Sequence, residues 1–466
     1  MEKNYLKITA LILISALIGL SSCQKEGCTD SEATNFDSKA KKDDGTCVYD
    51  TTSDEHNITD DGSGVGTTTW KSGETYILEG LVFVNDGQVL TIEPGTIIKG
   101  KDGQGEDASA LIVARGGKIM AEGTADDPII FTAESDDLNG SLSITDRGLW
   151  GGLIILGKAQ LNSTPGESAI EGIPTNETRG IYGGTDDTDD SGILKYISIR
   201  HGGTDIGEGN EINGLTLGGV GSGTTLEYIE VIANKDDGIE FFGGTPQIKY
   251  VVVSNCGDDS FDYDEGFRGK GQFWLAVQDE NAGDRCGEHD GGTDPETASP
   301  YATPEIYNVT YIGRGTGQGS RILTFRDNAG GTYANSIFVN QEKGIDIELL
   351  EGEGTYDRFQ AGELNLEGNV FYNVADGTAE SIFKISFGGG ASANPDSANA
   401  ASTFAAYFTT ANNSVENPEI DSVDPIPANP QTDNLATYPS SLFFETVSYK
   451  GAFDSENWAE GWTLLY

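Results

Sequence analysis

Short apolar stretches alternate with polar turns along most of the chain after Trp70. Each stretch has three to five residues, which is too short for a helix and too regular for an irregular loop. The first stretches are Leu81–Val84, Val89–Ile92, Thr96–Ile98, Leu111–Val113, Lys118–Met120 and Ile129–Phe131. Repeated short strands predict a parallel solenoid, in which each coil buries its apolar face by stacking on the next.

The later coils align with one another position by position. Residues 234–241 match residues 340–347, and residues 258–263 repeat residues 236–241 at an offset of 22. Because side chains alternate faces along a strand, this alignment predicts apolar residues that point inward and acids that point outward. The inward set is Ile239, Phe241, Phe261, Tyr263, Ile345 and Ile347, and the outward set is Glu240, Asp262 and Asp346. Asn234, Asn255 and Asn340 suit the preceding turns, since Asn tolerates left-handed backbone geometry.

Two sequence segments closely resemble the opening coils of right-handed β-helix proteins in the pectate-lyase-like class, TIEPGTIIKG and GTADDPIIFTA. The ending VSYKGAFDSENWAEGWTLLY is similar to the terminal stretch of a family of secreted bacterial β-helix proteins. The resemblance implies an all-β, right-handed parallel β-helix over residues 67–466, whose last coils are closed by Tyr449–Phe453 and Trp458–Trp462. The segment from Ser397, SANAASTFAAYFTTANN, is the one stretch that favours a helix.

The first residues resemble an export signal. Lys3 and Lys7 precede an apolar run, Ile8–Leu20, that is too short to span a bilayer comfortably. The following LSSC resembles a bacterial lipobox, which implies a signal peptide at residues 1–22 and a lipid anchor on Cys23. The next residues, QKEG, resemble the tag of lipoproteins that Bacteroidetes export to the outside of the outer membrane, which implies exposure at the cell surface.

Residues 23–50 follow the signal and precede a polar linker at residues 51–66. Gly27–Asp50 resembles a small module of secreted Bacteroidetes proteins, held by one disulfide, with Asp43-Asp44-Gly45 as a tight turn. Export favours cysteine pairing, and the four cysteines besides Cys23 allow three connectivities. Proximity in the sequence favours two pairs, Cys28–Cys47 and Cys256–Cys286.

The net charge of the chain limits the classes of ligand that it can bind. It has 75 acidic residues against 28 Lys and Arg, a net charge of −47. This balance argues against nucleic acid, because a polyanion would be repelled. It also disfavours direct binding of uronic-acid polymers unless a divalent cation bridges the two surfaces.

Acidic residues recur at equivalent positions of successive coils. Stacked coils lie about 4.8 Å apart, so these acids form a column of like charges. The column consists of Asp236, Asp237, Glu240, Asp258, Asp259, Asp262, Asp264 and Glu265. Such carboxylates raise one another's pKa, bind a hard cation such as Ca²⁺, or remain a solvated acidic ladder. The calcium hypothesis assigns Asp236, Glu240, Asp262 and Asp264 as ligands.

A catalytic hypothesis uses the same region. It assigns Asp237, Asp258 and Asp259 as catalytic acids, either as the carboxylate pair of a glycoside hydrolase or as the metal-binding acids of a lyase with Arg268 as base. Two further residues are predicted to contact a ligand. Trp274 offers an aromatic face to a sugar ring, and His289 lies in a loop that Cys286 would tether beside the acidic turn.

Together these features predict a lipoprotein of the outer membrane, exposed at the cell surface, whose β-helix binds an extracellular ligand, with a polysaccharide favoured. One alternative is a Ca²⁺-dependent polysaccharide lyase or a glycoside hydrolase. Another is a non-enzymatic adhesin or structural stalk. The fold does not choose among these, because function depends on a site.

Overall fold

The computed structural model describes residues 25–30, 33, 35–47, 54–207, 210–292, 295–393 and 395–466. The chain divides into two units, Met1–Ser53 and Asp54–Tyr466. The predicted signal peptide, residues 1–22, and the predicted lipidation site, Cys23, lie outside the described residues. Within the described ranges, no helix is both long enough and apolar enough to cross a membrane.

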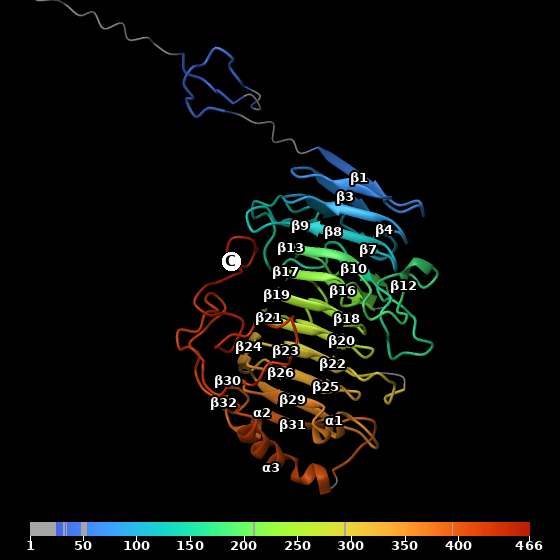
Figure 1. Ribbon diagram of the computed structural model, residues 1–466, viewed down its shortest axis with the longest axis vertical. Coiled ribbons are helices and arrows are strands. Elements are labelled where there is room, and N and C mark those ends of the chain that lie inside the picture. Colours follow the sequence, from blue (N-terminus) through green and yellow to red (C-terminus); the bar gives the residue numbers. More distant parts are fainter. Residues whose placement is uncertain are drawn as a thin grey trace, which may run out of the picture. The chain divides into compact units, whose positions relative to one another are not determined.

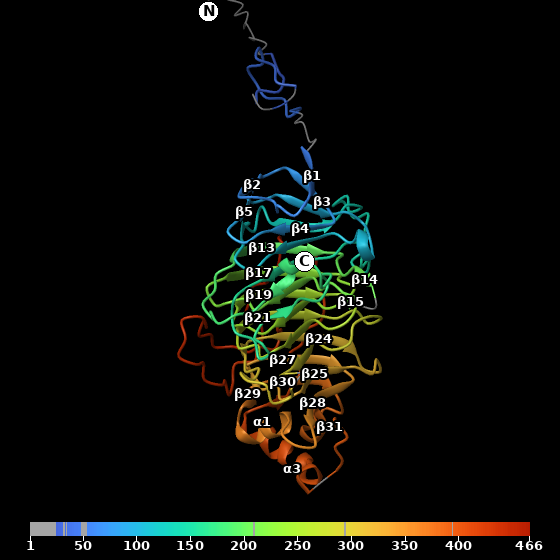
Figure 2. The same cartoon turned by 90° about the vertical axis from the view of Figure 1, so that its right-hand side faces the viewer.

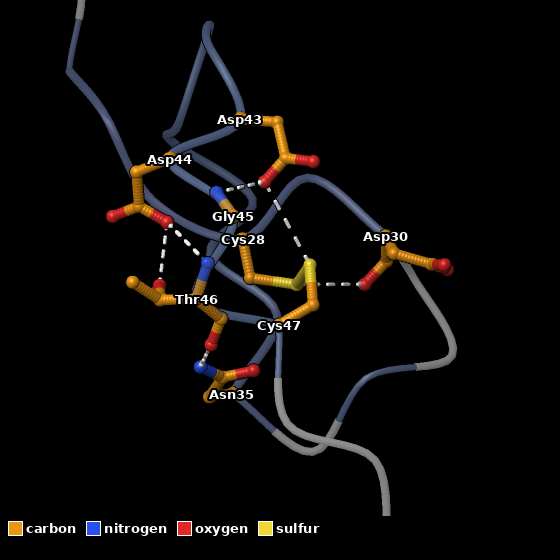
Figure 3. Close-up of a disulfide and its surroundings, with 8 residues drawn as sticks. All are labelled: Cys28, Asp30, Asn35, Asp43, Asp44, Gly45, Thr46 and Cys47. Carbon is orange, nitrogen blue, oxygen red and sulfur yellow. Dashed lines mark hydrogen bonds between the residues drawn. A yellow bond between two sulfur atoms is a disulfide. The ribbon is translucent and has the colours of Figure 1, made fainter.

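The first unit contains the predicted disulfide between Cys28 and Cys47 (Figure 3). The predicted turn is also present beside it. The Asp43 carboxylate accepts a hydrogen bond from the backbone N–H of Gly45 at 3.1 Å, and the Asp44 carboxylate accepts one from the N–H of Thr46 at 3.0 Å. The acids of this module therefore fix its turn through local hydrogen bonds.

The second unit is a parallel β-helix, whose strands stack in rows from one coil to the next (Figure 1). We call the row that carries the candidate site sheet three. Its ten strands are β4 (Leu81–Val84), β7 (Ala110–Val113), β10 (Leu153–Leu156), β16 (Leu215–Gly218), β18 (Ile239–Phe242), β20 (Phe261–Asp264), β22 (Gly287–Asp290), β25 (Arg321–Arg326), β28 (Lys343–Leu349) and β31 (Phe383–Phe387).

The other two rows are joined by four long strands that bend from one row into the other. These are β13 (Gly192–Arg200), β17 (Thr225–Ile232), β19 (Gln247–Ser254) and β21 (Lys270–Val277). Sheet one contains their first halves with β2 (Thr68–Trp70), β5 (Val89–Ile92), β8 (Lys118–Glu122), β23 (Glu305–Tyr307), β26 (Gly331–Ala334) and β29 (Leu364–Glu367). Sheet two contains their second halves with β1 (Glu55–Thr59), β3 (Thr75–Glu79), β6 (Ile97–Gly100), β9 (Ile129–Ala133), β24 (Thr310–Gly315), β27 (Ile337–Gln341), β30 (Val370–Val374) and β32 (Ser414–Val415).

Short elements interrupt or close the coils. Two small antiparallel pairs are β11 (Ser168–Ala169) with β12 (Ile181–Tyr182), and β14 (Asp205–Gly207) with β15 (Asn210–Glu211). Single 3₁₀ turns are η1 (Gly105–Asp107) and η2 (Thr178–Gly180). The described helices are α1 (Thr355–Ala361), α2 (Ala379–Ile382) and α3 (Pro395–Thr410). They lie at the end of the β-helix opposite β1 (Figure 2).

The predicted inward residues form the core. Ile239, Phe241, Phe261, Tyr263, Ile345 and Ile347 are each 2% exposed or less. Their register confirms the alignment of the coils, since Ile239 pairs with Phe261 and Phe241 pairs with Tyr263 on the neighbouring strand. The aromatic rings continue across the interior, where Phe261 stacks on Trp274 with ring centroids 4.6 Å apart. One continuous apolar interior therefore connects the coils.

A second aromatic column runs along the bend between sheets one and two. Tyr196, Tyr228, Tyr250 and Phe273 each have a positive φ, which costs a bulky residue about 1–3 kcal/mol. Their rings stack on one another, with centroids 4.4 Å apart between Tyr196 and Tyr228 and between Tyr228 and Tyr250. This stacking offsets part of the backbone strain.

The C-terminal segment was predicted to close the last coils. It packs instead on the outside of sheet two. It runs back along the β-helix until Leu464 and Leu465 donate backbone hydrogen bonds to the buried carboxylate of Glu230, on β17 (Figure 1). Trp458 and Trp462 pack edge-on against the aromatic column. Helices α1, α2 and α3 cover the last coils instead, through a buried set that includes Tyr356, Phe359, Phe404 and Phe408.

One boundary differs from that expected, and two helices were not predicted. Strand β1 lies inside the predicted linker, residues 51–66, and pairs in parallel with β3, because its backbone extends the row of sheet two by one strand. The predicted helix from Ser397 is confirmed as α3, but α1 and α2 were not expected, since each is too short to show a periodic pattern.

The predicted Cys256–Cys286 disulfide is wrong, because both cysteines are free and buried. The coil between them repeats at 26 positions, from Phe261 to its partner Gly287, whereas the cysteines are 30 positions apart. The register therefore places them four residues apart along the coil rather than above one another.

Replacement of Phe261 by Ala tests the continuous core. We expect the variant to lose about 3–5 kcal/mol of unfolding free energy, because the ring is buried against aromatic neighbours on both sides. Chemical denaturation followed by tryptophan fluorescence measures the loss. Thr225→Ala, on the exposed side of sheet one, is the control and is expected to change the free energy by less than about 0.5 kcal/mol. Equal effects of the two substitutions would contradict this packing.

Candidate functional site

The outer faces of the three sheets differ in what covers them. Sheet one carries solvated ion pairs such as Lys195–Glu227, 3.1 Å apart. Sheet two is covered by apolar residues of the C-terminal segment, including Phe453 and Ala459. The first coils of sheet three are covered by an insertion at residues 157–191, whose Leu161 and Tyr182 pack on that face. Beyond this insertion, the outer face of sheet three carries a concentration of carboxylates.

The register aligns these acids in columns. Thr216, Glu240, Asp262, Glu288, Thr324, Asp346 and Lys384 follow one another at the outward position of successive strands. The turn before each strand contributes further acids, with Asp236 and Asp237 before β18, Asp258 and Asp259 before β20, and Asp284 before β22. We call the carboxylates of β18, β20 and β22 and of the turns before these strands, together with Glu171 of the insertion, the acidic face.

The turn before each strand is fixed by side chains and by a small residue. Asn234 donates to the backbone oxygen of Asp237 at 2.7 Å. Gly238 follows the acid pair because a Cβ there would lie 2.2 Å from a methyl carbon of Val253. The predicted left-handed geometry is present at Asn255 and Asn340, whereas at the coil of Asn234 the preceding Ala233 adopts it.

The inner acid of each pair bonds to the backbone of the next coil. The Asp237 carboxylate accepts a hydrogen bond from the N–H of Asp259 at 2.8 Å, and the Asp259 carboxylate accepts one from the N–H of Arg285. Asp237 and Asp259 are both buried, whereas Asp236 is half-buried and Asp258 is exposed. The outer acids, Asp236 and Asp258, are therefore the ones that a ligand can reach.

Of the four predicted metal ligands, Asp236 alone belongs to a described group of acids close enough to share an ion. In the described ranges, two groups have one oxygen from each member within 4.8 Å of the others, Asp236 with Asp237 and Asp258, and Asp258 with Asp259 and Asp284. Glu240, Asp262 and Asp264 belong to neither group. The turn acids lie closer together because each turn carries two adjacent acids, whereas a strand carries at most one acid at each outward position.

The acidic face carries more negative charge than its neighbours balance. Burial raises the pKa of Asp236 to about 7, with further contributions from the carboxylates of Glu211, Glu171 and Asp258. Burial also raises the pKa of Asp262 well above its usual range, and Glu288 adds to the shift. The Asp262 Oδ1 atom is buried without a hydrogen-bond partner. These carboxyl groups are therefore poised to hold a proton or a cation near neutral pH.

Glu171 joins this face from a distant part of the chain. The buried amide of Asn213 donates to the Glu171 carboxylate at 3.1 Å and also to the Glu240 carboxylate. Burial raises the pKa of Glu240 well above its usual range, with Asp262 and Glu171 adding to it. Sequence reasoning did not find Glu171 because the insertion has no repeat that would align it with a coil.

Arg285, rather than Arg268, lies at the acidic face. The Arg285 guanidinium is 3.2 Å from the Asp259 carboxylate, 2.9 Å from Asp284 and 3.1 Å from Glu288. Arg326 also pairs with Glu288, at 2.8 Å. Arg268 follows the other end of β20 and pairs with Asp187 of the insertion at 3.1 Å. The prediction of Arg268 as a catalytic base beside Asp258 is therefore not supported, because the strand separates the two residues.

Trp274 and His289 were predicted to contact a ligand, but both are buried in the core. The Trp274 indole lies against Phe261 and donates to the backbone oxygen of Ile248 at 3.1 Å. His289 lies on β22, not in a loop, with its ring 4.2 Å from that of Tyr263 and its Nε2 atom 2.9 Å from the Tyr333 hydroxyl. Burial lowers the pKa of His289 to about 3. Both predictions are corrected, since the alternation of the strands turns these rings inward.

Comparison with known proteins adds one finding. A family model described as a pectate-lyase-like β-helix domain matches residues 62–463. Neither the curated proteins nor the solved structures include a match to the chain.

The raised pKa values predict how stability depends on pH. A carboxyl whose folded pKa is about 7, against 3.8 for an ordinary aspartate, holds its proton in the folded state up to higher pH. The contribution of this carboxyl group to the free energy of unfolding is therefore present at low pH and is lost as the pH rises from about 4 to 7. In EDTA, we expect the melting temperature to fall between pH 5 and pH 8, and Asp236→Asn to flatten this fall. Asp126→Asn, in an exposed turn, is the control, and an unchanged slope in Asp236→Asn would contradict the assignment.

The two arginines provide a matched test of the ion pairs. Arg285→Met leaves the buried Asp259 carboxylate without its cation and is expected to cost about 3–5 kcal/mol of unfolding free energy. Arg268→Met breaks a pair whose aspartate is 43% exposed and is expected to cost less than about 1 kcal/mol. Urea unfolding of both variants measures the difference, and similar losses would show that Arg285 does not serve the buried acids.

Proposed function

The chain belongs to the family of pectate-lyase-like β-helix domains, and on this premise we propose that it is a surface lipoprotein whose acidic face binds an extracellular glycan through Ca²⁺. Membership of this family supports a carbohydrate-related role or a place at the cell surface. The observation that carries the proposal is the group of carboxylates Asp236, Asp237 and Asp258, whose charge the neighbouring cations do not balance.

The donor set fits calcium. Ca²⁺ takes six to eight oxygen ligands at about 2.3–2.6 Å, so two of its ligands lie at most about 5 Å apart. The oxygens of Asp236, Asp237 and Asp258 are within 4.8 Å of one another, and all are hard carboxylate donors. Asp258 is exposed, so water and a sugar hydroxyl or carboxylate have room to complete the coordination. The ion would neutralise the acids and give a negatively charged chain a contact with a glycan.

The location proposed for the protein rests on its first residues. The apolar run before Cys23 and the small residues beside it favour lipid attachment, and the following charged residues favour export to the outside of the outer membrane. A protein held there by an acylated cysteine meets extracellular polysaccharides, and the long outer face of sheet three matches an extended polymer.

Binding is favoured over catalysis by the state of the arginines. Arg285 is engaged by three carboxylates, and Arg268 is paired with Asp187 at the other end of β20. Neither guanidinium is left to take a proton from a bound sugar. Asp237 and Asp259 are buried and accept backbone hydrogen bonds, so they support the turn rather than face a substrate.

The experiment that tests the proposal is a calcium titration followed by glycan binding. At pH 7.5, we expect Ca²⁺ to raise the melting temperature by several degrees, because the ion binds the folded state and relieves the repulsion. Asp258→Asn is expected to abolish the shift, since Asp258 belongs to both ion-sized groups. The exposed Asp126→Asn is the control and is expected to retain the full shift.

On a glycan array, we expect binding in Ca²⁺ that is lost in EDTA and in Asp258→Asn. Absence of any melting shift would contradict the calcium site, and absence of glycan binding in Ca²⁺ would contradict the proposed ligand. Release of new reducing ends or of unsaturated products, abolished by Asp258→Asn, would establish the lyase or hydrolase in place of a binding protein.

A further inference from the structure

A pocket of about 430 Å³ lies at the far end of sheet three, away from the acidic turns. It is formed where β25, β28 and β31 meet the short helix α2. Its floor contains the buried residues Gly344, Asp346 and Ser381, and Ile385 adds an apolar wall. Three cationic side chains, Arg321, Lys343 and Lys384, line the same pocket.

The pocket is lined by three cationic and three acidic side chains. Arg321 bonds to the Asp346 carboxylate at the floor. Lys343 and Lys384 are exposed, and no described carboxylate lies within ion-pair distance of either. Of the two other acids that line the pocket, Glu342 accepts the backbone N–H of Gly319 at 2.7 Å, and Asp376 lies exposed at the rim. Two lysines of this pocket are therefore available to a ligand.

The register of the strands forces these cations together. Arg321 and Lys343 are direct partners on neighbouring strands, and Lys384 is the direct partner of Asp346. Partners on neighbouring strands lie about 4.8 Å apart, so Arg321 and Lys343 repel each other across the pair. The buried carboxylate of Asp346 pairs with Arg321, which leaves Lys343 and Lys384 without an ion-pair partner among the described residues. An anion in the pocket would relieve this repulsion through charge-assisted hydrogen bonds.

We propose that this pocket is a binding site for a compact oxyanion, such as a sulfate ester or a carboxylate on a larger ligand. Lys343 and Lys384 bind its oxygens at the rim, and Arg321, oriented by Asp346, supplies a further N–H donor. The Ser386 hydroxyl also lines the pocket. The site is separate from the acidic face, because β28 is three strands from β20, or about 14 Å.

Titration of the protein with sodium sulfate in EDTA tests the proposal by calorimetry, with ionic strength held constant by sodium chloride. We expect saturable binding in the millimolar range. Lys384→Met and Lys343→Met are each expected to weaken it at least tenfold, and both side chains are exposed, so the fold is expected to survive. Lys195→Met is the matched control, since it removes an ion-paired lysine from the outer face of sheet one and leaves sulfate binding unchanged.

A parallel titration with acetate distinguishes the source of the oxyanion, since tighter binding of acetate than of sulfate points to a carboxylate ligand. Lack of saturable binding by both anions would overturn the proposal, and so would equal binding by the wild-type protein and the two lysine variants. Because neither calcium nor a glycan is present, these outcomes are independent of the function proposed for the acidic face.

Discussion

Parallel register between successive coils governs both the core and the outer faces of this β-helix. A coil of short strands cannot bury its apolar side chains alone, so each strand needs the backbone and the side chains of the next. The pairings Ile239 with Phe261 and Phe241 with Tyr263 show the result, because equivalent residues stack along one axis. The same register decides which polar residues meet.

Stacking of equivalent positions has an electrostatic consequence. A repeated acidic turn places like charges about one strand spacing apart, which a scattered distribution of the same residues would avoid. Three features of the protein reduce the repulsion between these carboxylates. The inner acids, Asp237 and Asp259, accept backbone hydrogen bonds from the next coil. Arg285 compensates several acids at once. The remaining carboxyl groups, such as Asp236, have pKa values raised toward neutral pH.

The outer faces of the β-helix acquire their different characters from segments outside the coils. The C-terminal segment covers sheet two and is fastened at Glu230, whose buried carboxylate accepts the backbone N–H groups of Leu464 and Leu465. The insertion at residues 157–191 covers the first coils of sheet three and brings Glu171 to the acidic face. These two segments leave the outer face of the later coils of sheet three uncovered. Charged side chains on this face line a pocket and contact solvent.

The coils could be predicted from the sequence, since alternation along strands such as Val89–Ile92 and the repeat of residues 236–241 depend on local pattern alone. The sequence also predicted that acids gather beside those strands and that Cys28 pairs with Cys47. The contacts that depend on coil length and on long-range packing are visible only in the folded chain. The 26-residue coil separates Cys256 from Cys286, and the strand direction turns Trp274 and His289 into the core. Arg285, and not Arg268, lies at the acidic face, and Lys343 lies beside Arg321. These neighbours depend on the number of residues in each coil, and because the coils differ in length, a local sequence pattern does not predict them.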